Sequence, residues 1–440
     1  MSVDAPAEKQ LLGLWMTGAL VVGSMIGAGI FLLPVSLAPL GLNAIVGWLI
    51  SSVGALCIAF SLATLTRAGG AGIQAHIERA FGPNVAYLVT WSLWCSYWAG
   101  NAALAIAIGS ALSWISPALA GPSFVIVVAT ASVVVLTLVN ARGARAAGGM
   151  SVATVAIKLI PLVAVIAIAI LRRADGGLER LPAVPLTLAG IATAVALTLF
   201  ALTGFETATT PVDKVRDPSR TLPLAIMGGT LLVALLYLAS SGSIQLLLPI
   251  DVVTRSGAPY ADAIATQWGR GAASLAAVAI AISAFGCLNG AILATGELGY
   301  SMALRGELPA AFAKTRGANT PVLSQLLGSS LTVVLILANS SRTTASLFTF
   351  VILLATAATL VLYGVGALAA WKQSSGVARR AAIIVALLFV LFAFYGAGFE
   401  ADAWGLVLLA IGIAVRVLMR TFNSRGSTPA AAAAPAALRE

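Results

Sequence analysis

Charged residues are scarce in this sequence, and their scarcity excludes a soluble protein. They make up 9% of the 440 residues, whereas hydrophobic residues make up 60%. A soluble domain carries about a quarter charged residues, because it must cover a water-facing surface. The chain is therefore predicted to fold with lipid as its solvent.

Residues that commonly carry enzyme chemistry are also few. The sequence has one histidine, His76, and three cysteines, Cys57, Cys95 and Cys287, which all lie in apolar runs. This distribution predicts no disulfide, no metal site and no cofactor. No phosphate-binding loop is present, and no nucleophile–base pair lies in the apolar runs, so an enzyme is not expected. We expect His76 to be solvated or interfacial, in a loop.

What the sequence does contain is a series of long apolar segments. Most reach the roughly 20 residues that a helix needs to cross hydrocarbon. They do not alternate in polarity as the strands of a β-barrel do. We therefore predict an all-α membrane protein with twelve transmembrane helices, at about 11–38, 42–65, 84–115, 123–139, 148–171, 187–212, 222–247, 272–304, 321–337, 345–371, 381–399 and 404–420.

The formal net charge of +10 is explained by topology. Most Lys and Arg residues fall in loops on the side of the N-terminus, so the positive-inside rule predicts a plasma (inner) membrane protein with both termini in the cytoplasm. Residues 1–10 are then a cytoplasmic tail, and the low-complexity segment 421–440 is a disordered one. No nucleic-acid partner is expected.

Two segments carry features that interrupt a helix inside the membrane. VVGSMIGAGIFLLP, residues 21–34, holds three glycines, and LTLFALTGFETATTP, residues 197–211, holds Gly204 and the intramembrane Glu206. Glycines so placed free backbone N–H and C=O groups to bind a polar substrate. In one helix, such spacing more often serves close packing. Two breaks at corresponding positions of successive five-helix groups favour an inverted-repeat transporter with a midplane site.

Together, GSMIGAGIFLLP, GGAGIQAHIERAFGP and TGFETATTPVDKVRDPSRTLPLAI resemble the amino acid–polyamine–organocation (APC) family, and within it the basic amino acid/polyamine antiporters such as the arginine/agmatine antiporter. The resemblance covers about residues 10–420. It implies a LeuT-like fold with an inverted repeat of helices 1–5 (about 11–171) and helices 6–10 (about 187–371). Helices 11 and 12 (about 381–420) follow. It also implies alternating access and a homodimer.

The resemblance also implies which residues bind substrate. The first break would hold the substrate's α-carboxylate, and the second would receive its α-amino group. Asn101 matches a substrate-contacting asparagine, and Phe200 matches the position of a gating tryptophan. Trp98 lies one turn from Asn101 and is expected beside it. The implied substrate-binding set, apart from the eighth helix, is Ser24, Ile26, Gly27, Ala28, Gly29, Trp98, Asn101, Phe200, Ala201 and Thr203.

At two positions the chain departs from the arginine/agmatine antiporter. Ala291 stands where an eighth-helix tryptophan stacks on the guanidinium there, and Leu93 replaces a tyrosine gate. Loss of a cation–π partner forfeits about 1–2 kcal/mol for a desolvated cation. The departures favour a neutral amino acid, or a larger side chain that fills the space at Ala291.

Three ionisable residues lie within the apolar segments, and we predict that they serve gating or proton coupling. Lys158 resembles the fifth-helix lysine of sodium-independent, proton-coupled APC members. At ~1.5 Å per residue, Lys158 and Glu297 lie about 15 and 12 Å above the cytoplasmic face. We therefore predict a direct or water-bridged pair between them. Glu206 either carries a proton or braces a helix.

From these observations we predict a secondary active transporter of amino acids, working as an amino acid/amine antiporter or a proton-coupled symporter. One alternative is an antiporter for diamines or polyamines, of the agmatine or putrescine type. An alternative of another class is a substrate sensor without transport. The expected partners are a small amino acid or amine, protons and the lipid bilayer.

Overall fold

The computed structural model of the protein describes residues 13–426 except 28, 67–71, 120, 143–144, 180, 182, 206–214 and 317–319. Across these ranges the chain forms helices and no β-strand, which confirms the all-α prediction. The α-helices are α1 (Leu14–Met25), α2 (Gly29–Leu37), α3 (Leu42–Thr66), α4 (Ile73–Phe81), α5 (Pro83–Ser113), α6 (Pro122–Ala141), α7 (Arg145–Ala174), α8 (Leu188–Leu202), α9 (Pro218–Leu247), α10 (Ile250–Arg255), α11 (Pro259–Leu304), α12 (Val322–Ala338), α13 (Thr344–Gln373) and α14 (Val377–Gly426).

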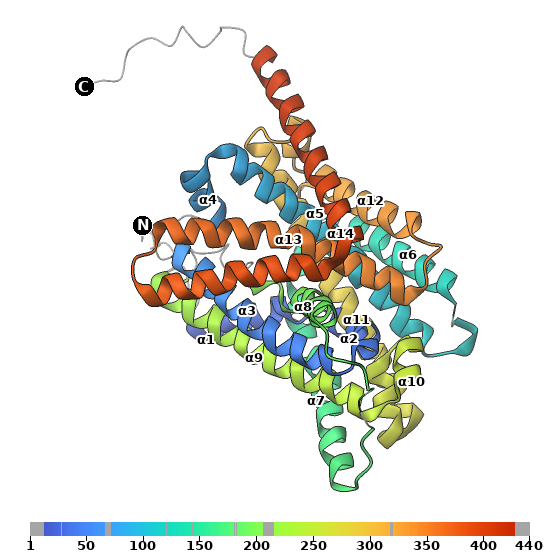
Figure 1. Ribbon diagram of the computed structural model, residues 1–440. Helices are drawn as coiled ribbons and strands as arrows, with labels where there is room; N and C mark the ends of the chain where they lie inside the picture. The colour runs from blue at the N-terminus through green and yellow to red at the C-terminus, as the bar shows by residue number, and fades with distance from the viewer. Residues whose placement is uncertain are drawn as a thin grey trace, which may run out of the picture.

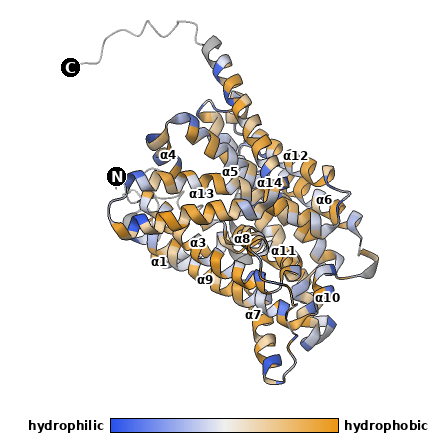
Figure 2. Ribbon diagram, in the orientation of Figure 1, coloured by the Kyte–Doolittle hydropathy of each residue, from blue (hydrophilic) through white to orange (hydrophobic). Residues whose placement is uncertain are grey.

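Among the described helices, seven are long and apolar enough to cross a membrane: α3, α5, α6, α9, α11, α13 and α14. The bent pair α1–α2 makes an eighth if it counts as one span. Large apolar side chains point outward from these helices, including Val127 (65% exposed), Leu275 (74%) and Leu391 (66%). Figure 2 shows apolar residues along the outside of the helices as well as between them. Helices that are apolar all round indicate a lipid environment, so the protein is a multi-pass membrane protein.

Helix α5 forms the centre of the bundle. It packs against α11, α13 and α6, and most of its residues are buried. Around it, α3 packs against α8 and α9, α7 packs against α11 and α9, and α13 packs against α14. Figure 1 shows α3, α9, α13 and the first part of α14 running side by side. Glycines allow the close approaches, since a Cβ at Gly47 would lie 2.4 Å from the Ala194 Cβ.

The first predicted break lies between α1 and α2, whose axes differ by 49°. The second predicted break falls in the segment 187–212, where α8 ends at Leu202. Thr187 caps the start of α8, because its hydroxyl accepts a hydrogen bond from the Gly190 N–H at 3.0 Å. The C-terminal ends of α1 and α8 lie inside the bundle, since Met25 and Leu202 are buried. Backbone groups at these two ends are available to a ligand.

Two long helices differ from the predicted segmentation. Helix α11 begins at Pro259, ahead of the predicted segment 272–304, and is interrupted at Gly269 (φ 75°). Helix α14 joins the predicted segments 381–399 and 404–420 through Gly398 (φ 83°). Glycine tolerates these positive φ values, so each helix bends sharply at that residue. Helix α14 also continues to Gly426, beyond the predicted end at 420, and residues 427–440 lie outside the described part.

Helix α4 corrects the prediction of a loop with a solvated histidine. Residues 73–81 form a helix in which Ile73, His76 and Ile77 are buried, and His76 is 0% exposed. The expectation was wrong because the spacing of these three residues places them on one helical face. That face packs toward α5 and α13.

Candidate functional site

A cavity of about 350 Å³ lies where the broken first helix meets the end of α8. A volume of this size is sufficient for a small organic molecule. Residues of α1, α2, α5, α7, α8, α9, α11 and α13 line it, together with the connections after α1 and α8. They are Gly23, Ser24, Met25, Gly27, Gly29, Ile30, Ser96, Tyr97, Gly100, Asn101, Leu104, Lys158, Phe200, Ala201, Thr203, Gly204, Tyr237, Cys287, Gly290, Ala291, Ala294 and Thr359.

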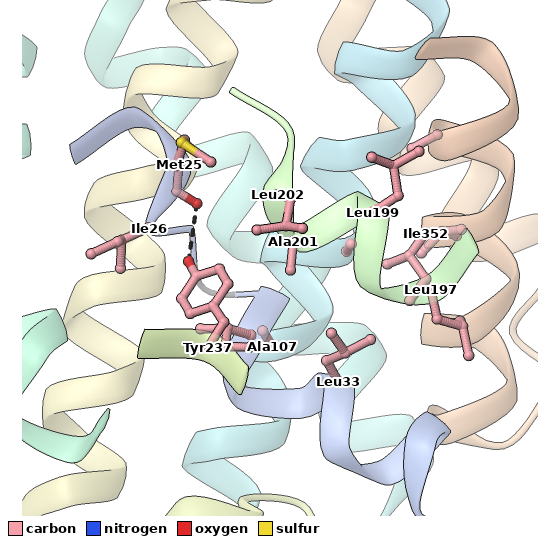
Figure 3. Packing of buried hydrophobic residues seen from close by; sticks show 14 of the residues in the cluster. Met25, Ile26, Leu33, Ala107, Leu197, Leu199, Ala201, Leu202, Tyr237 and Ile352 are labelled. Atoms are coloured by element: carbon pink, nitrogen blue, oxygen red, sulfur yellow. Dashed lines mark hydrogen bonds between the residues drawn. The ribbon is translucent and has the colours of Figure 1, made fainter. Parts of the chain in front are cut away.

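The backbone of the first break is fixed by a tyrosine from α9. The Tyr237 hydroxyl donates a hydrogen bond to the Met25 carbonyl at 3.0 Å, as Figure 3 shows. The Gly27 N–H also points to this carbonyl, at 2.7 Å. Tyr237 is 0% exposed, and its ring packs edge-on against Trp48. The break is therefore held open by tertiary contacts, and glycine flexibility alone does not determine its shape.

The second break touches the first directly. After α8 the chain is extended at Thr203, and Gly204 follows at φ +112°. The Ser24 hydroxyl lies 3.1 Å from the Gly204 carbonyl, and a Cβ at Gly204 would lie 2.8 Å from the Ser24 carbonyl oxygen. Gly204 is thus required both by its backbone conformation and by the close approach. Across the same gap, a Cβ at Gly29 would lie 2.7 Å from the Phe200 ring.

A hydrogen-bonded chain joins the wall made by α5 and α11. The Asn101 Nδ2 group donates to the Thr295 hydroxyl at 3.0 Å, and that hydroxyl donates to the Ala291 carbonyl at 2.7 Å. Because the Thr295 proton is committed to Ala291, its oxygen must accept, which fixes the orientation of the Asn101 amide. Asn101 Oδ1 is buried without a hydrogen-bond partner among the described residues. An unpaired buried acceptor is rare in a folded protein, and this makes Asn101 a candidate functional residue.

Lys158 of α7 carries the formal charge of the cavity wall. Its side chain is 2% exposed, and it is the one ionisable Lys, Arg, Asp or Glu among the described lining residues. The ion pairs of the described chain do not include it. A buried ammonium without a protein counterion is costly, and this makes Lys158 a candidate functional residue.

The structure brings most of the predicted site residues to one cavity. Their roles in binding stay predictions. Ile26 and Trp98 are buried at 0% and 6% exposure and are not among the lining residues. Ala28 and Glu206 lie outside the described residues. The predicted residues that line the cavity are Ser24, Gly27, Gly29, Asn101, Lys158, Phe200, Ala201, Thr203 and Ala291.

The direct pair predicted between Lys158 and Glu297 is not formed. Both residues are described, and no ion pair joins them. The Glu297 side chain is exposed, whereas that of Lys158 is buried. Residue spacing along a helix sets the depth of each side chain in the membrane, but it does not set the direction in which the side chain points. A pair bridged by water stays a prediction.

Sequence reasoning missed several lining residues, above all Tyr97, Leu104, Tyr237 and Cys287. Tyr97 and Leu104 flank Asn101 at helical spacing, so the stripe around Asn101 carried a usable signal. Tyr237 stands in an ordinary apolar stretch, and no local pattern distinguishes it. Its role depends on the register between α9 and α1.

Replacing Tyr237 with phenylalanine is expected to weaken substrate binding three- to tenfold, because one hydrogen bond that shapes the break is lost. The ring and its contact with Trp48 remain, so thermal stability should change little. Substrate dependence of transport, measured as KM, checks this. Tyr395→Phe is the matched control, since Tyr395 is 60% exposed on α14. Equal KM values for the two variants would contradict the assigned role of Tyr237.

A second cavity, of about 800 Å³, lies at the ends of α5, α10 and α11. Its charged lining residues are balanced, with Asp251 and Asp262 opposing Arg255 and Arg270. Asp262 already accepts hydrogen bonds from Trp114, at 2.6 Å, and from Ser256. The cavity at the two breaks is therefore the stronger candidate, because it lies where two apolar helices are interrupted inside the bundle.

Comparison with known proteins relates this chain to a family of transporters. A family model described as amino acid permease matches residues 12–421. The putrescine transporter PotE of Haemophilus influenzae is 27% identical over 92% of this chain and 96% of its own length. The cadaverine/lysine antiporter of Escherichia coli is 30% identical over 77% of this chain and 78% of its own length. The putrescine transporter PotE of Escherichia coli is 26% identical over 92% of this chain and 95% of its own length.

Proposed function

The chain belongs to the amino acid permease family, and on that premise we propose that it is a secondary active transporter of amino acids that works by alternating access. The observation that carries the proposal is the cavity at which the open backbone of the first break meets the end of α8. Backbone N–H groups at such ends bind a carboxylate, and carbonyl groups bind an ammonium. An α-amino acid presents both groups on adjacent atoms.

We also propose that the chain crosses the membrane twelve times. Twelve spans would arise if α1–α2 form one, α11 crosses after Gly269, and α14 supplies the last two on either side of Gly398. The shorter apolar helices α8 and α12 would complete spans within the bundle. Helices α1–α7 and α8–α13 would then be the two inverted repeats, with both termini in the cytoplasm and the protein a homodimer in the plasma membrane.

Transport is proposed to be either amino acid/amine antiport or proton-coupled symport. Lys158 supports a coupling role, because it is buried at the cavity wall. Glu206 and Glu297 remain proposed coupling or gating residues. The names of the relatives favour a second candidate function, antiport of a diamine such as putrescine or cadaverine.

Uptake into proteoliposomes tests the proposed function. Labelled amino acids and amines would be offered with and without internal substrate, and with and without an inward pH gradient. We expect amino acid uptake that requires either the internal substrate, for antiport, or the gradient, for symport. A correctly folded protein that takes up no member of the panel under any condition would refute the transport proposal.

A further inference from the structure

The charge of the central cavity restricts which substrates can bind. Relatives of this chain carry names that specify diamines, and a diamine brings two positive charges and no carboxylate. The described residues of the cavity wall supply one ammonium, Lys158, and no acidic side chain. A diamine would therefore meet a buried like charge where it needs two counterions.

We propose that this transporter excludes diamines and takes α-amino acids with uncharged side chains, and that Lys158 is the residue that sets this preference. The inference rests on the proposed function, since it assigns the substrate class of the same cavity. A zwitterionic amino acid brings a carboxylate that the ammonium attracts, whereas a diamine brings only repulsion. Lys158 is here a specificity-determining residue.

One further carboxylate at the cavity would not change the preference. Glu206 lies outside the described residues, but even if its carboxylate faced the cavity, it would balance Lys158 alone. The other acid of the apolar segments near the site, Glu297, has an exposed side chain and does not line the cavity. Among the lining residues that the structure describes, no carboxylate is then left over for either ammonium of a diamine.

The wall beside the first break favours an apolar substrate side chain. On α11, Cys287, Gly290, Ala291 and Ala294 share one face at helical spacing, and on α5 Leu104 faces the same cavity. Their small or apolar side chains leave room next to the break and offer no counterion. The amide side chain of Asn101, which also lines this wall, is neutral.

Aromatic rings at the cavity do not replace the missing carboxylates. The Phe200 ring packs on Gly29, where a Cβ would come within 2.7 Å of it. Tyr237 is 0% exposed and uses its hydroxyl to hold the Met25 carbonyl. These two rings are thus committed to the shape of the breaks, and one further ring, Tyr97, is half-buried at the wall. A cation–π cage needs several free ring faces.

Competition binding to the purified full-length protein in lipid nanodiscs tests the proposal. The probe is labelled leucine, and the competitors are unlabelled leucine, methionine, alanine, lysine, putrescine and cadaverine. We expect putrescine and cadaverine to compete at least about thirtyfold more weakly than the best neutral amino acid. Lys158→Met should lower the ratio of diamine to neutral amino acid dissociation constants at least about tenfold, because the repelling charge is gone. Lys158→Arg should preserve the ratio.

Lys314→Met is the matched control, since Lys314 is exposed and does not line the cavity. Binding of diamines by the unmodified protein as tightly as neutral amino acids would overturn the proposal while leaving transport intact. An unchanged ratio in a folded Lys158→Met variant would overturn the role of Lys158. If the protein neither binds nor exchanges any amino acid or amine, the proposed function itself fails, and the assignment of a substrate class fails with it.

Discussion

Replacing Gly204 with alanine is expected to reduce transport by at least about thirtyfold, because a non-glycine residue at this conformation costs about 1–3 kcal/mol and the added methyl group has no room. Gly204 has φ +112°, and the new Cβ would lie 2.8 Å from the Ser24 carbonyl oxygen and 3.3 Å from the Met25 Cα. These atoms are backbone of the first break, so they cannot rotate away. The two breaks would have to separate, and the cavity between them would change shape.

The effect should appear in substrate binding as well as in transport. Ligand-induced thermal stabilisation of the purified variant measures binding directly. Gly228→Ala is the matched control, since no atom lies within 4 Å of a Cβ built on this helical glycine of α9. Near-normal transport by a folded Gly204→Ala variant would contradict the close contact between the breaks.

Replacing Ala291 with tryptophan is expected to lower the affinity for amino acids with large side chains at least about tenfold, because an indole would occupy much of the cavity. Ala291 lines the cavity from α11, and the cavity holds only about 350 Å³. Alanine as substrate should suffer less than leucine or methionine, since its side chain needs little of that space. The ratio of the leucine and alanine affinities, measured by competition binding, is the informative quantity.

Leu275→Trp is the matched control for this variant. Leu275 lies on the same helix but is 74% exposed on the outer surface, where a tryptophan is tolerated in lipid. Variants with equal leucine-to-alanine ratios would show that substrate side chains do not approach Ala291. The cavity would then be occupied in some other orientation, with the side chain toward α7 or α9.

The features that the sequence predicts correctly are those that depend on the residue types within one short segment. Long apolar runs predicted the helices, and the glycines of residues 21–34 predicted the break between α1 and α2. Gly204 likewise predicted an interruption of the helix, and α8 ends two residues before it. Each of these signals acts over a few residues, so no knowledge of the packing was needed.

Orientation around each helix was less predictable. Trp98 was expected beside Asn101 because it lies three residues away, yet the lining residues Tyr97, Gly100, Asn101 and Leu104 form a stripe with Trp98 at its edge. At about 100° per residue, Trp98 is rotated away from the middle of that stripe. Its ring is 6% exposed and packs into the bundle.

The direction of buried charges also escaped sequence reasoning. Lys158 and Glu297 were assigned similar depths, which a count of residues can provide. Whether two side chains face each other depends on the rotation of α7 and α11 about their axes, and the structure turns Glu297 outward. The consequence is a cavity with an ammonium and no carboxylate among its described lining residues, which depth alone did not suggest.

Protection of a single cysteine tests most directly whether substrate occupies this cavity. Cys287 lines it, while Cys57 and Cys95 do not, so a Cys57→Ala/Cys95→Ala protein leaves one reactive thiol at the site. The rate of Cys287 modification by a membrane-permeant maleimide would be measured with and without saturating substrate. We predict that a transported amino acid slows the reaction at least about tenfold, because a bound ligand fills a cavity of this size. An unchanged rate, with a substrate that still stabilises the same protein against heat, would place the binding site elsewhere.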